Sequence, residues 1–245
     1  MFKIMLNNRK KTKKTPAIVL AFSICILLVS SSDAAWIPLT DAYSISSIPT
    51  GGVEVDEILF SDFEVTGLAY GGVLEPTADS ILIQGGQDND TGNLGIRFLL
   101  LWAAGSNQLI NAAINFKVSA AYEHCCIKDA TLNLEAADIS GTGLAGATEN
   151  IYDADFLGNS LASLATSSQA DDFGAFLTDD SDLSINGVPT PTKEIWIRTG
   201  ITIQGGTNGS ASLYEVSMLY GHVPEPATVL LLGFGSLAFL RMRRR

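Results

Sequence analysis

The sequence predicts an all-β ectodomain, an antiparallel β-sandwich or jelly roll, with an N-terminal signal helix and a short C-terminal transmembrane helix. Three observations lead to this fold class. Apolar and polar residues alternate with period two in most segments between Trp36 and Gly221. Glycine pairs and clusters of Asp and Asn separate these segments at short intervals. Finally, the chain begins and ends with an apolar run that basic residues flank.

Segment 114–120 shows the strand pattern most clearly. Ile114, Phe116 and Val118 alternate with polar residues, so one face can pack against a second sheet while the other meets water. The predicted strands, in chain order, are Val53–Phe60, Ser80–Gln84, Ile96–Trp102, Ile114–Ala120, Thr131–Glu135, Ile151–Phe156, Glu194–Arg198, Ile201–Gln204 and Tyr214–Met218. Many short strands of this kind favour a sandwich over a helical fold.

Glycines mark the predicted turns. These turns are Gly51–Gly52, Gly71–Gly72, Gly85–Gly86, Gly141–Thr142–Gly143 and Gly205–Gly206. The phrase Ile-x-Ile-Gln-Gly-Gly occurs at both 81–86 and 201–206. Duplication could explain it, but the similarity extends no further, so we attribute it to convergent strand-and-turn chemistry. Leu157–Phe176 is rich in Ala and Ser and is the one place where we expect a short helix.

Charge is distributed unevenly along the chain. Its formal net charge is −11, but ten of the 15 basic residues lie in the first 14 and the last five positions. Between Trp36 and Gly221 there are five basic and 24 acidic side chains, a net charge of −19. Nucleic-acid binding is excluded as a function class, because it needs clustered Lys and Arg. The acidic surface instead favours solubility, divalent cations or cationic partners.

Residues 1–34 have the three parts of a signal peptide. A basic cluster over 9–14 precedes an apolar run over 17–29, and small residues follow. The run is shorter than the roughly 20 residues of a membrane span. We therefore expect export and cleavage after Ala34. The alternative is an uncleaved anchor helix.

Residues 222–245 form a three-part tail. Pro224-Glu225-Pro226 keeps the chain extended, since proline disfavours helix there. The apolar run 227–240 would form a helix of about 21 Å, short for a bilayer core of roughly 30 Å. The run is followed by a basic end, which favours the cytoplasmic side of the membrane. Its arginines, the predicted membrane stop, are Arg241, Arg243, Arg244 and Arg245.

This tail resembles the PEP-CTERM sorting signal, in which Val-Pro-Glu-Pro-Ala, a Leu- and Gly-rich run and an Arg-rich end occur in this order. The resemblance implies that Pro224, Glu225 and Pro226 are the recognition motif. It also implies processing by an exosortase, a polytopic membrane cysteine protease, and a link to exopolysaccharide or biofilm. The alternative is a generic tail anchor. The ectodomain, residues 35–221, is similar to an uncharacterised domain found ahead of such tails, carried by Gly51–Phe63, Gly95–Phe98 and Gly205–Ser212.

Catalytic signatures are scarce, and we predict that the protein is not an enzyme. Zinc-protease and nucleophile-elbow motifs are absent, and the ectodomain has one histidine, His124. On a strand, His124 and Cys126 would share a face that Cys125 does not, and two ligands are fewer than a zinc site needs. Adjacent cysteines also bridge only with strain. A glycosidase carboxylate pair stays open as an alternative, because sequence spacing cannot show the distance between two acids.

Calcium is the cofactor that the sequence best accommodates. Asp88, Asn89, Asp90 and Asn93 group oxygen ligands in a Gly-flanked loop. The loop lacks the bidentate Glu of an EF-hand, because Leu99 occupies that position. Further candidates are Asp171–Asp172 and Asp179–Asp182. The competing explanation is that these are solvated acidic hairpin tips.

The sequence favours an exported cell-surface or extracellular-matrix protein that is transiently anchored in the membrane and has a structural or adhesive role. Exosortase, the export machinery and exopolysaccharide are the expected partners. The alternative is a carbohydrate-binding module. Trp196 lies between core-facing Ile195 and Ile197, so we expect its ring to face outward. The other aromatic candidates are Trp102, Tyr122, Tyr152 and Tyr214.

Overall fold

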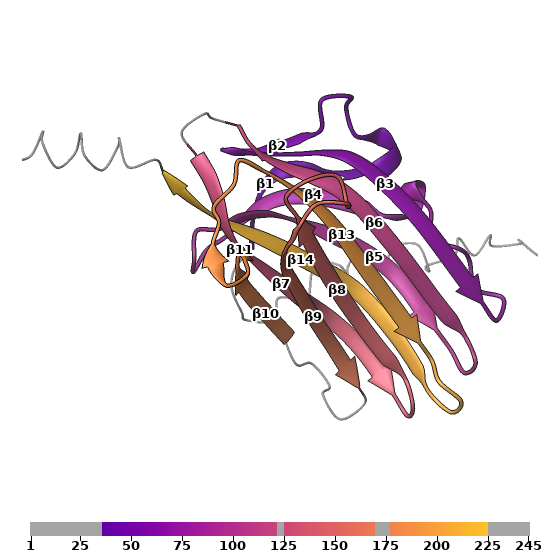
Figure 1. Ribbon diagram of the computed structural model, residues 1–245. Coiled ribbons are helices and arrows are strands. Elements are labelled where there is room, and N and C mark those ends of the chain that lie inside the picture. Colours follow the sequence, from indigo (N-terminus) through magenta and orange to yellow (C-terminus); the bar gives the residue numbers. More distant parts are fainter. Residues whose placement is uncertain (1–35, 122–124, 170–176, 225–245) are drawn as a thin grey trace, which may run out of the picture. The chain divides into compact units, whose positions relative to one another are not determined.

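A computed structural model describes residues 36–121, 125–169 and 177–224. These residues form two six-stranded antiparallel sheets that pack face to face (Figure 1). The described residues contain no α-helix. Their helical segments are two single 3₁₀ turns, η1 (Ile45–Ser47) and η2 (Ala78–Ser80). The predicted all-β antiparallel class is therefore confirmed. The two terminal helices expected from the sequence lie outside the described residues.

Sheet A has the strand order β1-β4-β5-β14-β7-β10. The strands are β1 (Trp36–Ser44), β4 (Leu82–Asp88), β5 (Leu94–Ala104), β14 (Ser210–Pro224), β7 (Cys125–Ser140) and β10 (Leu177–Asp182). Sheet B has the order β2-β3-β6-β13-β8-β9. Its strands are β2 (Val53–Val55), β3 (Ile58–Tyr70), β6 (Leu109–Ala120), β13 (Glu194–Gln204), β8 (Leu144–Tyr152) and β9 (Ser160–Gln169). A small hairpin joins β11 (Ser184–Ile185) to β12 (Val188–Pro189).

The core lies between the two sheets and follows the alternation seen in the sequence. Ile114, Phe116 and Val118 of β6 are fully buried, as are Ile195 and Ile197 of β13. Phe116 contacts Phe98 of sheet A edge to face, at 6.1 Å between ring centroids. Residues of both sheets belong to one hydrophobic cluster, so burying their inner faces stabilises the sandwich.

Strand boundaries differ from the sequence prediction in several places. The predicted strand Ile151–Phe156 is only the end of β8, which stops at Tyr152, and Phe156 lies in the loop that follows. The predicted strand Val53–Phe60 is two strands, because the tight turn between β2 and β3 has a positive φ of 51° at Asp56. Conversely, Glu194–Arg198 and Ile201–Gln204 are one strand, β13. Gly200 interrupts the side-chain pattern there, but it keeps its ladder partners on both sides, Ala113 and Thr148.

Two further sequence predictions are wrong. Gly85 and Gly86 lie inside β4 rather than in a turn. Close packing requires glycine at both positions, because an added Cβ would clash with the side chain of Val55 at Gly85 and with that of Trp36 at Gly86. The helix expected within Leu157–Phe176 is instead a strand over residues 160–169, while 170–176 lie outside the described residues. Leu164, Thr166 and Ser168 of β9 are buried and alternate with exposed neighbours, a period of two that a rich content of Ala and Ser conceals.

The glycine phrase that occurs twice adopts two structures. At 81–86 both glycines continue a strand, whereas at 201–206 they follow β13, and Gly206 has a φ of 65°. This difference agrees with convergence rather than duplication. Within the described residues, no helix is long and apolar enough to cross a membrane.

Candidate functional site

The loop predicted to bind calcium connects β4 to β5. Asp88 is buried, and its Oδ1 accepts hydrogen bonds from the backbone N–H of Asp90 at 2.9 Å and of Thr91 at 2.7 Å, and from the Thr91 hydroxyl at 2.9 Å. This oxygen caps the turn. Asn89 and Asp90 are exposed. In the described part of the chain, no three His, Cys, Asp or Glu residues come together as a possible metal site. Calcium binding remains a prediction.

The other metal candidates are only partly described. His124 lies outside the described residues, as do Asp171 and Asp172. Cys126 is a half-buried free cysteine on β7. Asp179 of β10 is used structurally, because its Oδ2 accepts the backbone N–H of Ala165 at 2.7 Å, which ties β10 to β9.

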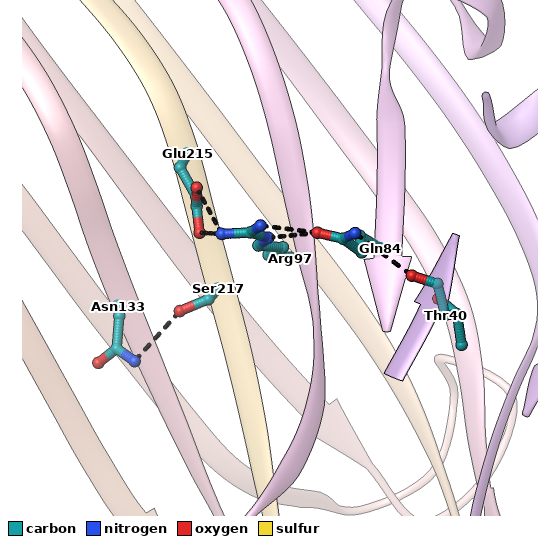
Figure 2. Close-up of polar contacts among 6 residues, drawn as sticks. All are labelled: Thr40, Gln84, Arg97, Asn133, Glu215 and Ser217. Carbon is teal, nitrogen blue, oxygen red and sulfur yellow. Dashed lines mark hydrogen bonds and ion pairs between the residues drawn. The ribbon is translucent and has the colours of Figure 1, made fainter. Parts of the chain in front are cut away.

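The outer face of sheet A carries hydrogen-bonded polar side chains on β4, β5 and β14, here called the Arg97 network (Figure 2). Arg97 lies between Gln84 and Glu215. Its Nε and Nη2 donate to Gln84 Oε1 at 2.9 and 2.6 Å, and its Nη1 donates to both oxygens of Glu215 at 2.9 and 3.1 Å. Gln84 Nε2 in turn donates to the backbone carbonyl of Thr40 at 3.3 Å. The Trp36 ring lies 5.4 Å from the guanidinium.

The Arg97 network is best explained as a structural link between neighbouring strands. Arg97 directs all three guanidinium nitrogens at other side chains of the same face, and the side chains of Arg97 and Glu215 are only 22% and 15% exposed. Next to it, Asn133 Nδ2 donates to the Ser217 hydroxyl at 3.2 Å. These hydrogen bonds link β4 to β5, β5 to β14 and β14 to β7, and so help to hold the four strands in register, although Asn133 Oδ1 is buried without a partner.

The outer face of sheet B has a different character. Its strand register places one row of polar residues across five strands, here called the polar row: Glu64, Asn115, Arg198, Asn150 and Ser163. Five strands at 4.7–4.9 Å spacing span about 19 Å. The next row towards the start of β13 contains Lys117, Trp196 and Tyr152.

An aromatic cluster lies on this face, formed by Trp196, Tyr152 and Phe156. Phe156 lies in the loop after β8, which folds back over the sheet, and the φ angle of Phe156 is positive, at 51°. Its ring contacts Trp196 at 5.5 Å and Tyr152 at 6.2 Å, both edge to face. All three rings are half-buried rather than enclosed. The prediction that Trp196 points away from the core is confirmed.

Hydrogen bonds orient the polar row beside the aromatic cluster. Arg198 Nε donates to Asn115 Oδ1 at 3.2 Å, and the Ser163 hydroxyl donates to Asn150 Oδ1 at 3.0 Å. The Arg198 guanidinium also lies 5.1 Å from the Phe156 ring centroid. Arg198 is exposed, so its terminal nitrogens can donate to a ligand. Asn115 and Asn150 are half-buried, and each carries an amide NH2 group that is a potential donor.

Beyond the polar row the surface becomes smooth. The adjacent row consists of Thr66, Ala113, Gly200, Thr148 and Ala165, all with short side chains. The side chains of the aromatic cluster and the polar row are therefore longer than those of the adjacent row on the same face. The geometry suits an extended ligand that has apolar ring faces and many hydroxyl groups.

A buried carboxyl group lies between the sheets. Glu149 of β8 is fully buried, and its Oε1 accepts the hydroxyl of Tyr220 of β14 at 2.7 Å, while Oε2 has no partner. Burial raises the pKa of Glu149 from 4.5 to about 8, although the Tyr220 hydrogen bond opposes this rise. Burial also raises the pKa of Tyr220, with the Glu149 charge as a second cause. Glu149 faces the core and has no surface exposed to solvent.

The remaining aromatic candidates lie elsewhere. Trp102 is buried in the core. Tyr214 is 40% exposed on sheet A, where its hydroxyl donates to Asp138 Oδ2 at 3.1 Å. Tyr122 lies outside the described residues. Phe156 was missed as a site residue, because the sequence predicts a strand over Ile151–Phe156, whereas β8 ends at Tyr152 and Phe156 lies in the loop that follows.

Comparisons with known proteins identify the tail. The PEP-CTERM protein-sorting motif matches residues 222–245, which confirms the resemblance seen in the sequence: the chain carries the sorting motif of an exosortase substrate. No curated protein matches the chain.

Several solved structures are distantly similar. TmCBM61 in complex with β-1,4-galactotriose is 9% identical, with 65% of this chain and 88% of that chain covered and a TM-score of 0.32. The xylan-binding module CBM15 is 12% identical, with 67% and 96% covered and a TM-score of 0.26. The family 11 carbohydrate-binding module from Clostridium thermocellum is 8% identical, with 79% and 99% covered and a TM-score of 0.23. At these TM-scores the likeness carries no argument about the ligand.

Proposed function

Because the chain carries a PEP-CTERM sorting motif, we propose that it is an exported, non-enzymatic protein of the cell surface or extracellular matrix that adheres to exopolysaccharide. The outer face of sheet B is the binding surface in this proposal. The motif implies export and transient anchoring in the membrane before an exosortase acts on it. Retention at the surface then follows from binding to polysaccharide.

One observation carries the proposal: on the outer face of sheet B, Trp196 and Tyr152 lie directly beside the polar row. A sugar ring has C–H groups on its faces and hydroxyl groups around its edge. An aromatic ring packs against the former, while amide and guanidinium groups bind the latter. Arg198, Asn115 and Asn150 supply these polar groups at one row's distance from the aromatic cluster.

Net charge narrows the ligand class to neutral polysaccharide. The ectodomain has a net charge of −19, and on this face Lys117 is already paired with Asp62 at 3.8 Å and Glu194 at 3.4 Å. Glu64 lies in the polar row itself. An acidic polymer would therefore be repelled over most of its length, at distances up to a Debye length of about 8 Å at physiological salt.

The competing explanation is that the aromatic cluster only stabilises the β8–β9 connection. Phe156 does pack against Trp196 in a T-shaped arrangement, at 5.5 Å between ring centroids, and Lys117 Nζ lies 5.5 Å from the Trp196 ring centroid. Among the described residues, however, Asn115 and Asn150 make no ring contact with the aromatic cluster, and they lie in the row beside it. Variants of these polar residues separate the two explanations.

The test is affinity gel electrophoresis of the purified mature protein in gels that contain neutral polysaccharides, including the exopolysaccharide of its own host. We expect Trp196→Ala and Arg198→Ala each to weaken binding about tenfold, the equivalent of about 1.4 kcal/mol. Tyr214→Ala is the matched control, an exposed aromatic residue on the opposite sheet. Equal retardation of all three variants and the wild type, at unchanged melting temperatures, would refute the binding face.

A further inference from the structure

A surface hollow of about 460 Å³ lies at the carboxyl end of β13, whereas Trp196 lies near the amino end of this strand. The β5–β6, β7–β8 and β13–β14 turns meet there, at the lower right of Figure 1. These turns supply most of the lining, namely Asn107, Gln108, Thr142, Gly206 and Thr207. All the residues that line the hollow are uncharged, so its polar side chains are amides and hydroxyls.

Hydrogen bonds between the turns fix the walls of this hollow. The Asn107 N–H of the β5–β6 turn donates to the Gly206 carbonyl of the β13–β14 turn at 2.6 Å. The Asn208 N–H of the β13–β14 turn donates to Thr142 Oγ1 of the β7–β8 turn at 3.0 Å. Because the turns are already held together, a ligand that binds there does not have to order them, which lowers the entropic cost of binding.

Several polar side chains of the hollow are available to a ligand. Asn107, Gln204 and Thr207 are exposed, and their side chains make no hydrogen bond to another residue in the described part of the chain. Gln108 differs, because its amide bonds two backbone groups of neighbouring segments at 2.7 and 3.0 Å. Uncharged groups that can both donate and accept suit the hydroxyl groups of a neutral sugar.

The hollow adjoins the outer face of sheet B. Leu109 and Gln204 line it and are paired with each other across β6 and β13. Gln204 and Trp196 are eight positions apart on one strand, an even number, so their side chains are on the same face. Tyr70 of β3 pairs with Leu109 and is 56% exposed. An aromatic ring is therefore present at this end of the face as well as at the Trp196 end.

The two ends are connected by a stretch of short side chains. Eight residue steps of about 3.3 Å separate Trp196 from Gln204, which is roughly 26 Å along β13. Between Arg198 and Gln204 the outward residues of β13 are Gly200 and Thr202, and both have short side chains. A ligand chain laid along β13 therefore meets no long side chain of this strand between its two ends.

From this arrangement we infer that the ligand is a linear neutral polysaccharide that lies along β13 and is held at both ends of this strand, which rests on the proposed function. The aromatic cluster and Arg198 bind one part of the chain, while Tyr70, Gln204 and the hollow bind another. The second contact forms within a molecule that is already bound, so the two strengthen each other. An extended hexasaccharide reaches both ends, whereas a disaccharide occupies only one, and the domain therefore selects for chain length.

The test is an NMR titration of the ¹⁵N-labelled mature protein with a disaccharide and a hexasaccharide, both prepared from the neutral polysaccharide that retards the protein most in the affinity gels. We expect the hexasaccharide to bind about tenfold more tightly than the disaccharide. Tyr70→Ala and Gln204→Ala should each weaken hexasaccharide binding at least threefold and leave the disaccharide-induced shift of the Trp196 indole unchanged. Two matched controls should bind the hexasaccharide like the wild type: Tyr214→Ala on sheet A, and Asn89→Ala, an exposed amide in the turn at the opposite end of β5.

The wild type supplies a readout that does not depend on how the variants fold. The hexasaccharide should shift both the Trp196 indole resonance and the side-chain amide resonances of Gln204. A hexasaccharide that moves the Trp196 signal alone, or that binds no more tightly than the disaccharide, would overturn the second contact and leave the proposed function standing. Equal hexasaccharide affinity of wild type, Tyr70→Ala and Gln204→Ala would do the same. A protein that no neutral polysaccharide retards would refute the proposed function and this inference together.

Discussion

The carboxyl group buried between the sheets should make the stability of the domain fall as pH rises. The pKa of Glu149 is about 8 in the folded protein and about 4.5 in the unfolded chain. Between these values the unfolded state has released its proton and the folded state has kept it, so the free energy of unfolding decreases with pH. A difference of roughly 3.5 pKa units corresponds to at most about 5 kcal/mol at 1.36 kcal/mol per unit.

Glu149→Gln isolates this effect. The amide is uncharged at every pH and keeps an oxygen that can accept the Tyr220 hydroxyl. Like the protonated carboxyl, it leaves the group at the Oε2 position without a partner. We therefore expect wild type and variant to be about equally stable near pH 4.5, and the variant to be more stable by up to about 5 kcal/mol at pH 9.

Urea unfolding of the mature protein, followed by tryptophan fluorescence at steps between pH 4.5 and 9, measures both free energies. The decisive quantity is the difference between wild type and variant, because all other titrating groups are common to both. The difference should grow steadily between pH 4.5 and 8 and then level off. A difference that does not change with pH, or one that favours the wild type at pH 9, would refute the argument.

Three further predictions concern stability and are measured by the same unfolding assay. Arg97→Ala leaves the Glu215 carboxylate without its ion pair and should destabilise the protein by about 2 kcal/mol. An unchanged free energy of unfolding would show that the Arg97 network does not link the strands of sheet A. Asp88→Ala removes the acceptor of three hydrogen bonds in the β4–β5 turn and should cost about 2 kcal/mol, against no measurable loss for the exposed neighbour Asn89→Ala. Gly85→Ala would place a Cβ against the Val55 side chain and should cost about 1–3 kcal/mol, so a neutral result would mean that β2 can shift freely.

Side-chain alternation made the fold class and the two faces of the long strands predictable. In β6 and β13 the period of two is strict, so the buried residues and the outward direction of Trp196 and Asn115 follow from the sequence alone. The same argument failed for β9, because Ala, Ser and Thr differ too little in polarity to show which face is buried. It also failed at Gly85 and Gly86, where close packing requires glycine although the backbone does not turn.

The candidate site depends on distances that the sequence does not contain. Arg198 and Asn150 are 48 positions apart and become neighbours only through the register of β13 with β8. Phe156 joins Trp196 because its loop folds back over the sheet. The buried pair of Glu149 and Tyr220 needs both strand register and the packing of one sheet on the other. In contrast, the sorting tail is a continuous segment, so the order of its residues is enough to identify the motif.

The proposed binding face can be tested most directly with the three tryptophans of the chain, Trp36, Trp102 and Trp196. Each gives one indole N–H resonance, and they lie on the outer face of sheet A, in the core and on the outer face of sheet B. When neutral exopolysaccharide of the host is titrated into the ¹⁵N-labelled mature protein, the account predicts that the Trp196 resonance shifts while that of Trp102 stays in place. A shift confined to Trp36, or none at saturating polysaccharide, would contradict it.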